Sequence, residues 1–506
     1  MNWKVIGRSL KSRDMQKRIF AVIGIIIVFR LMAHIPIPFA DQATVKQVLD
    51  GLFSSESAPQ LLNFLNIVSG GALANFSIMV AGLGPYINAS IIMQLLTRAI
   101  PKLETLRKEG ESGQRKINQW TRILTFPLAI IQAIGSIYLI RQAAQSVSGI
   151  GDITAGADIW QWVLMVSALT AGSMIMMWFG EQITEQSIGN GISLLITAGI
   201  VSTLPSMIGN IGSAAFGGDN KSVVFGREIP VDTTDFLFIL VMLAVVVIMT
   251  WLVVRLSEGR RELTVNYAKR VQGNRTYGGV TTILPVKLIT AGVVPIIFAV
   301  AFLSVPSFLG QILTSNSDPK LAELGTNLTT WFQAPNASSL TSGDWHAFIY
   351  PVTYFLLVVL FTFFYTSITF NAKDIAENLQ KQGGFIEGVR SGVQTEKYLS
   401  KVVSRLTLFG AISIGLLAMV PIVGQLFTTY DVTLGGTGIL ILVTVALEVL
   451  RAVESRALMI TYDQYSSPDF FGGDDDGDGI VDGPGANKPR RRIFGRKNIE
   501  TAGAKA

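Results

Sequence analysis

The sequence predicts an all-α polytopic membrane protein with ten transmembrane helices, arranged as two inverted halves of five helices. Three observations predict this fold class. Ten long apolar stretches divide the 506-residue chain, its basic residues fall on alternate segments between them, and only 15% of its residues are charged. Soluble domains average about 25% charged residues. The composition and the mean hydropathy of +0.46 therefore indicate a membrane protein.

Each apolar stretch is long enough for a membrane-spanning helix. About 20 helical residues cross the roughly 30 Å hydrocarbon core, and a helix satisfies its own backbone hydrogen bonds in lipid. The first stretch has no small-residue cleavage site, because Pro36 and Pro38 follow it. It is therefore predicted to be a retained span and not a signal peptide. The predicted spans are 19–39, 76–97, 120–140, 159–180, 188–208, 236–254, 283–305, 349–370, 402–423 and 438–459.

The basic residues between the spans predict the topology. Counted from the N-terminus, the odd segments hold 32 Lys and Arg residues and the even segments hold 5. Without the seven basic residues beyond position 487, the ratio is still 25 to 5. Because Lys and Arg mark the cytoplasmic face, both termini are expected in the cytoplasm. Residues 1–18 then form a cytoplasmic N-terminus, and 255–282 and 371–401 are large cytoplasmic loops.

Matching interruptions indicate an internal repeat between a first half, 19–208, and a second half, 236–459. Since each half has an odd number of spans, two halves of similar fold have opposite orientations. A proline in each second span is expected to kink the helix. The alternative is that Gly and Pro are simply common in membrane helices. The matched pairs are Gly82-Leu83-Gly84-Pro85 with Ala291-Gly292-Val293-Val294-Pro295, and Gly189-Asn190-Gly191 with Gly435-Gly436-Thr437-Gly438.

The spans offer little charge at mid-membrane, where ion-coupled pumps place buried carboxylates. Spans two, four, five, six and eight contain no Asp, Glu, Lys or Arg. This favours an apolar channel, with an inverted-repeat secondary transporter of a small solute as the alternative. Glu448 is the exception of interest. With Arg451 and Glu454 it follows an i, i+3, i+6 spacing on one helical face, which we interpret as facing protein or a wet vestibule.

Catalytic and metal-binding functions are not predicted. The chain has no cysteine, and its two histidines, His34 and His346, are far apart in sequence. It therefore lacks thiol nucleophiles and cysteine-based metal sites. It also has no catalytic constellation for an intramembrane enzyme and no phosphate-binding G-x-x-x-x-G-K-[ST] loop. No cofactor is expected. The net charge of +6 lies mostly on the predicted cytoplasmic loops, so anionic lipid or an rRNA surface is a candidate partner and specific DNA is not.

The most specific signal is a series of eight stretches between about residues 15 and 465. They are IPIPF from Ile35, SGGALANFSIMVAGLGPYINASIIMQLL from Ser69, KEGESGQRKINQWTR from Lys108, GEQITEQSIGNGISLLITAGIV from Gly180, VNYAKRVQG from Val265, LPVKLITAGVVP from Leu284, FNAKDIAENLQKQGGFIEGVRSGVQTEKYL from Phe370 and GGTGILI from Gly435. This series resembles the SecY family, the central subunits of the bacterial protein-conducting channel. The resemblance implies a channel that passes unfolded polypeptides across the membrane and releases apolar helices sideways into it.

The resemblance implies that a ring of apolar side chains closes an hourglass pore at mid-membrane. Apolar, flexible side chains exclude water and ions yet deform around a passing chain, and such constrictions gate by dewetting. Without the resemblance, each of these residues would be an ordinary lipid-facing or packing residue. The matching positions are Leu83, Ile87, Ile192, Ile196, Ile297 and Ile441.

A plug and a lateral gate are also implied by the resemblance. The segment 61–74, with Leu65, Gly70 and Gly71, resembles a short helix that blocks the pore from outside, although an amphipathic surface loop is the alternative. Spans two and seven correspond to the lateral gate, through which signal sequences and membrane helices leave into lipid. For Asn88 and Gln94, the alternative is that their side chains only form hydrogen bonds to neighbouring helices. The gate residues are Pro85, Asn88, Gln94, Thr290 and Pro295.

The loops 255–282 and 371–401 resemble the docking sites for the ribosome and for the SecA motor ATPase. Arg270, Arg275 and Arg390 are the predicted docking residues, because basic loops attract phosphate backbones and acidic surfaces at long range. The resemblance further implies SecE and SecG as heterotrimer partners, signal peptides and nascent chains as substrates, and the bacterial inner membrane as the location.

The tail 466–506 lies outside the resemblance. Asp474, Asp476 and Asp478 are spaced like the start of a calcium loop. Gly485 stands where such a loop needs a bidentate ligand, so no calcium site is predicted. We expect a disordered acidic segment followed by a basic run.

Overall fold

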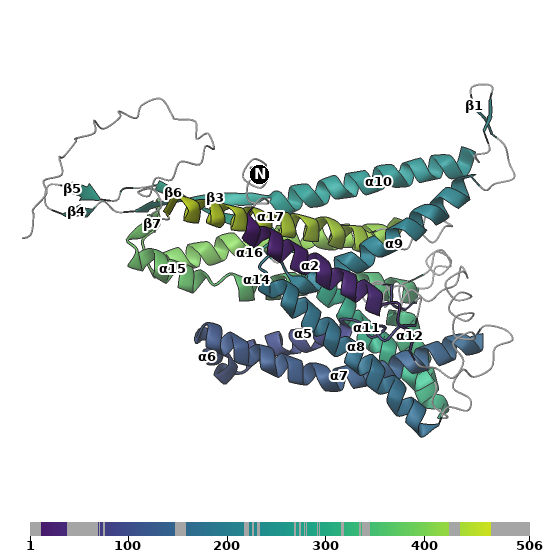
Figure 1. Cartoon of the computed structure of the whole chain (residues 1–506). Helices are drawn as coiled ribbons and strands as arrows, with labels where there is room; N and C mark the ends of the chain where they lie inside the picture. The colour runs from purple at the N-terminus through teal and green to yellow at the C-terminus, as the bar shows by residue number, and fades with distance from the viewer. Residues whose placement is uncertain are drawn as a thin grey trace, which may run out of the picture. The chain divides into compact units, whose positions relative to one another are not determined.

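A computed structural model shows the fold of the chain (Figure 1). It describes residues 12–37, 69, 71–73, 76–146, 158–216, 222–224, 227–229, 233–267, 270–272, 275–277, 279, 281–290, 292, 294–314, 318–332, 335, 345–424 and 436–466. The chain divides into two units, 1–458 and 459–506. The described part of the second unit is the helical segment 459–466.

A helix overlaps each of the ten predicted spans. Those of the first half are α2 (Arg13–Met32), α5 (Gly84–Ala99), α7 (Glu111–Ser146), α8 (Ile159–Glu185) and α9 (Gly191–Phe216). Those of the second half are α10 (Thr233–Glu258), α11 (Val294–Thr314), α14 (Ile349–Thr369), α16 (Val393–Gly424) and α17 (Gly436–Ser466). Shorter helical elements lie between them: α6 (Pro101–Lys108), α12 (Pro319–Phe332), η1 (Trp345–Phe348) and α15 (Ala372–Lys381).

Capping residues explain where several helices begin. The Ser12 hydroxyl accepts a hydrogen bond from the Met15 backbone at the start of α2. Asp158 and Gln161 form a capping box at the start of α8. Asn371 caps α15 in the same way as Ser12 caps α2. Each cap satisfies backbone N–H groups that have no partner within the helix.

Span two begins as a helix later than predicted. Residues 76–83 form turns, apart from Ser77, which makes an isolated bridge with Pro36, and α5 starts at Gly84 with Pro85 in its first turn. Gly82 has a φ of +55°, which glycine adopts at little cost. Proline in the first turn removes no helical hydrogen bond. The predicted kink at Pro85 is therefore wrong, because this proline starts the helix.

Span seven departs from its prediction in the same way. Residues 281–287 form a strand, and α11 starts at Val294 with Pro295 in its first turn. Gly292 has a φ of +60° and lies three residues before this proline, as Gly82 does before its own. The kink predicted at Pro295 is therefore also wrong, because this proline lies at the start of a helix. The two halves therefore share one local design at matching positions.

Strands correct the all-α prediction, although the fold is mostly helical. β3 (Arg260–Tyr267) lies between β6 (Thr281–Lys287) and β7 (Gly384–Ile386) in a three-stranded antiparallel sheet. We name it the cytoplasmic sheet because β3 and β7 belong to the two loops that are predicted to be cytoplasmic. Leu263 and Val265 of β3 are buried and Thr264 between them is exposed, an alternation typical of a half-buried strand. Two small hairpins pair β1 (Ser222–Val224) with β2 (Arg227–Ile229) and β4 (Arg270–Gln272) with β5 (Arg275–Tyr277).

Two hydrophobic clusters form the described core. The larger draws side chains from α2, α5, α8, α9, α10, α11, α14, α16 and α17. The smaller lies between the cytoplasmic sheet, α15 and the start of α16, which are neighbours in Figure 1. Glycines allow close helix packing, as is common in membranes. A Cβ on Gly191 of α9 would lie only 1.9 Å from the carbonyl oxygen of Gly180 in α8.

Within the described residues, four helical stretches are long and apolar enough to cross a membrane. They are Glu111–Tyr138, Ile159–Glu185, Trp345–Lys381 and Val393–Val420. Gly191–Pro205 and Val294–Ser307 are shorter apolar helices. Length and composition therefore indicate a multi-pass membrane protein.

Candidate functional site: an apolar cluster that contains the predicted ring residues

All six predicted ring residues belong to the larger core cluster or pack against it. Leu83 ends the turn before α5, and Ile87 lies in the first turns of α5. Ile196 of α9 is buried, and Ile192 of the same helix is partly buried against the cluster. The buried residues Ile297 of α11 and Ile441 of α17 complete the set. Tertiary packing thus brings apolar side chains from four helices into one cluster.

The two predicted gate helices are neighbours, because α5 contacts α11. Pro85 and Pro295 are both buried at the helix starts. Asn88 is partly buried in α5. The hydroxyl of Thr290 donates to that of Thr366 at 3.1 Å and so ties the segment before α11 to α14.

Gln94 gives α5 an unusual polar feature. Its Nε2 donates to the Ser90 hydroxyl at 3.0 Å, so this amide bonds within its own helix. Its Oε1 is buried and accepts no hydrogen bond from any described residue. A buried acceptor without a partner costs about 1–3 kcal/mol. This group therefore does not hold α5 to its neighbours.

Much of the predicted plug, including Leu65 and Gly70, lies outside the described residues. The described end of the segment is buried at Ala72 and Leu73. Gly71 has a φ of +82°. A Cβ added there would lie 3.7 Å from both an Arg30 nitrogen in α2 and the Ser202 hydroxyl in α9. The end of the segment therefore reaches between the first and fifth predicted spans.

The cytoplasmic sheet joins the two predicted docking loops. Val265 of the first loop pairs with Ile386 of the second, and both side chains are buried in the smaller cluster. Arg390 is exposed just beyond β7, and its carbonyl accepts a hydrogen bond from the Thr395 hydroxyl at 3.0 Å. Sequence reasoning missed this connection, since the three residues of β7 are too few to show a strand period.

The other two docking residues lie together in the small hairpin. Arg270 is in β4 and Arg275 is in β5, and the register pairs them with Tyr277 and Gln272 respectively. Arg270 and Arg275 therefore lie within strands, and Arg390 lies just beyond one, in the two loops that are predicted to be cytoplasmic.

Several charged side chains interact with neighbouring elements. Arg122 of α7 forms a two-pronged ion pair with Glu181 of α8, with N···O distances of 2.8 and 2.9 Å. Arg451 of α17 donates to the Ser257 carbonyl at the end of α10, at 2.9 Å. Partial burial and then the positive charge of Arg451 lower the pKa of Lys287, at the end of β6, while the charge of Glu448 opposes this shift.

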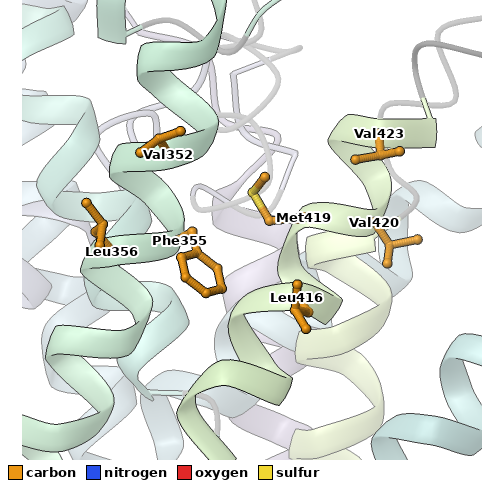
Figure 2. A pocket seen from close by; sticks show the side chains of 7 residues that line it. All are labelled: Val352, Phe355, Leu356, Leu416, Met419, Val420 and Val423. Carbon is orange, nitrogen blue, oxygen red and sulfur yellow. The ribbon is translucent and has the colours of Figure 1, made fainter.

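An apolar pocket lies between α14 and α16 (Figure 2). Its volume is about 470 Å³, and it contains none of the predicted ring residues. Its lining has no polar side chain and consists of Val352, Phe355, Leu356, Leu416, Met419, Val420 and Val423. Among the described residues, no group of three or more His, Asp or Glu side chains is placed to hold a metal ion.

Comparison with known proteins identifies the family. The SecY family model matches residues 77–450. The chain is 39% identical over 463 residues to the protein translocase subunit SecY of Streptomyces galbus, covering 91% of this chain and 98% of that protein. It is 36% identical over 461 residues to the same subunit of Mycobacterium tuberculosis, covering 90% and 98%.

Solved structures show the same fold. A protein-conducting channel matches with a TM-score of 0.56 and 19% identity, over 88% of this chain and 92% of that one. A SecY structure, whose plug domain stabilises the closed state of its channel, matches with a TM-score of 0.57 and 19% identity, over 87% and 92%. The described helices and the sequence match agree, and this chain belongs to the SecY family.

Proposed function

We propose that the chain is the channel-forming subunit of a Sec protein translocase, which moves unfolded polypeptides across the membrane and membrane helices laterally into it. The observation that carries this proposal is the apolar cluster. In a chain of the SecY family, all six ring positions, which lie in or directly before four separate helices, enter or contact one cluster. A small-solute transporter would need a polar site in its place, so the comparisons and the cluster both favour the channel.

The seal works by excluding water. Leu83, Ile87, Ile192, Ile196, Ile297 and Ile441 surround the passing chain when the channel is active. When it is idle, their apolar surfaces dewet the constriction and block ions. The segment 61–74 acts as the plug, and its buried end at Ala72 and Leu73 supports a seat inside the protein.

Lateral release occurs between α5 and α11, the two gate helices. Their contact is supported by the structure, and their matching Gly-x-x-Pro starts suit two related halves that separate as units. Gln94 of α5 has a buried Oε1 that accepts no hydrogen bond from the described residues. Asn88, Thr290 and the two prolines Pro85 and Pro295 complete the gate.

The cytoplasmic loops dock the partners that drive movement. Arg390, Arg270 and Arg275 attract acidic protein surfaces or RNA phosphates at long range. The partners are SecA, the ribosome, and SecE with SecG in a heterotrimer. A Sec61 channel of similar fold was determined in a canine ribosome-channel complex. The chain itself is a channel subunit without catalytic residues or cofactors. It lies in the bacterial inner membrane, crosses it ten times and has both termini in the cytoplasm.

Single-channel conductance tests the seal. Ile192→Ser, Ile297→Ser and Ile441→Ser should each raise ion leak through the closed channel in planar bilayers, because polar side chains wet the constriction. The triple variant should leak more than any single variant. Deletion of 61–72 should raise the leak further.

A matched control uses three isoleucines with exposed side chains on other helices. Ile123→Ser, Ile248→Ser and Ile412→Ser together remove the same atoms from surfaces that lie outside the ring. This control should stay closed. Tight closure of the ring triple variant without its plug would refute the proposed seal.

A further inference from the structure

Two arginines of the first half bond to one helix end of the second half. The Arg98 guanidinium, in the last turn of α5, donates to the carbonyl of Ser367. Arg107, in the last turn of α6, donates to the next carbonyl, that of Ile368, at 3.1 Å. The donors are nine positions apart on two helices, whereas the acceptors are consecutive. Both bonds therefore converge on the C-terminal turn of α14.

The end of α14 is chemically suited to accept them. The last carbonyls of a helix have no partner within the helix and carry partial negative charge. The Phe370 N–H bonds to the Thr366 carbonyl, after which the backbone turns to an extended conformation. The next two carbonyls thus need outside donors. Guanidinium groups stay charged and give strong charge-assisted hydrogen bonds to such acceptors.

These bonds lie at the seam that the proposed gate must open. Arg98 belongs to the gate helix α5, which contacts α11, and α11 in turn contacts α14. The Thr290–Thr366 bond fastens the last turn of α14 to the segment before α11. Movement of α5 and α6 away from α11 and α14 must therefore break both arginine bonds.

We propose that Arg98 and Arg107 form a clasp that positions α5 against the second half and holds the seam closed. The effect of the clasp on transport rests on the proposed function of α5 and α11 as a lateral gate. Structurally, the clasp is a cap: two arginines of the first half bond to the C-terminal carbonyls of α14 in the second half. The clasp would set the population of the open seam before any substrate arrives.

Spin labelling tests the clasp on the full chain in lipid nanodiscs. The chain has no cysteine, so Ile92→Cys on α5 and Val305→Cys on α11 give two unique, solvent- or lipid-exposed label sites. Pulsed EPR then measures the distance between the helices. Arg98→Gln with Arg107→Gln should increase the long-distance population relative to the short one by roughly tenfold, which corresponds to about 1.4 kcal/mol.

The matched control removes the same charge nearby. Lys102 is exposed on α6, and Arg115 is exposed and pairs with Glu111 one turn earlier in the same helix. Lys102→Gln with Arg115→Gln should leave the distances unchanged, which separates the clasp from general loss of cytoplasmic charge.

Three outcomes decide the proposal. The proposal is supported if the ratio of long to short distances rises about tenfold in the Gln pair (Arg98→Gln with Arg107→Gln) and rises less when both arginines are replaced by Lys. Identical distances in the Gln pair and the control overturn it. If the Gln pair does not fold, Arg107→Gln alone is measured, and an unchanged distribution there overturns it. Polypeptide transport by the control variant is measured in parallel, so failure of the proposed channel function is seen separately.

Discussion

The cytoplasmic sheet offers a sharp test of whether the two proposed docking loops form one folded unit. Leu399, near the start of α16, has no exposed surface and belongs to the smaller cluster with Leu263, Val265 and Ile386. Leu399→Ala removes apolar contacts that join both loops. A fully buried Leu→Ala change costs roughly 2–5 kcal/mol. At tenfold per 1.4 kcal/mol, even the lower value raises local opening about 30-fold.

Hydrogen–deuterium exchange measures this opening directly. Peptides that cover 260–267, 281–287 and 384–386 should lose protection together, because their strands pair through β3. The control is Leu408→Ala in the same helix, where half of the side chain surface is exposed. Its expected cost is about 0.5 kcal/mol or less, so these peptides should keep their protection.

The result can refute the reasoning in two ways. Unchanged exchange in Leu399→Ala would show that the smaller cluster does not stabilise the sheet. Loss of protection in 260–267 and 281–287 alone would show that β7 does not couple the second loop to the first.

The remaining predictions concern docking, packing and topology. Arg390→Glu should abolish SecA-driven export while changing the unfolding free energy by about 0.5 kcal/mol or less, because its side chain is exposed; normal export would exclude its docking role. Gly191→Ala should lower the melting temperature through a clash that costs about 1–3 kcal/mol, whereas Gly209→Ala in the same helix meets open space and should not. Reporter fusions after Lys108 should be cytoplasmic and those after Ser339 external, and the reverse pattern would overturn the ten-span topology.

Local features of the chain were predictable from sequence. The length and apolarity of a span depend on consecutive residues, so each predicted span overlaps a helix of the structure. The sequence also shows the two Gly-x-x-Pro interruptions at Gly82 and Gly292, but it does not show that each one marks the start of a helix. The positive φ angles turn the prolines into helix starts, and a sequence pattern does not distinguish a kink from a start. The SecY resemblance, based on long ordered stretches, agrees with the family match.

Tertiary structure decided the features that join distant residues. The pairing of Val265 with Ile386 spans about 120 residues of sequence, and a three-residue strand has no period to detect. The same holds for the convergence of Arg98 and Arg107 on α14, since a basic residue near a helix end is equally typical of a lipid-facing or solvated position. Apolar length is encoded locally because the bilayer acts on each span separately. Partners across the fold are set by which helices pack together, and that depends on the whole chain at once.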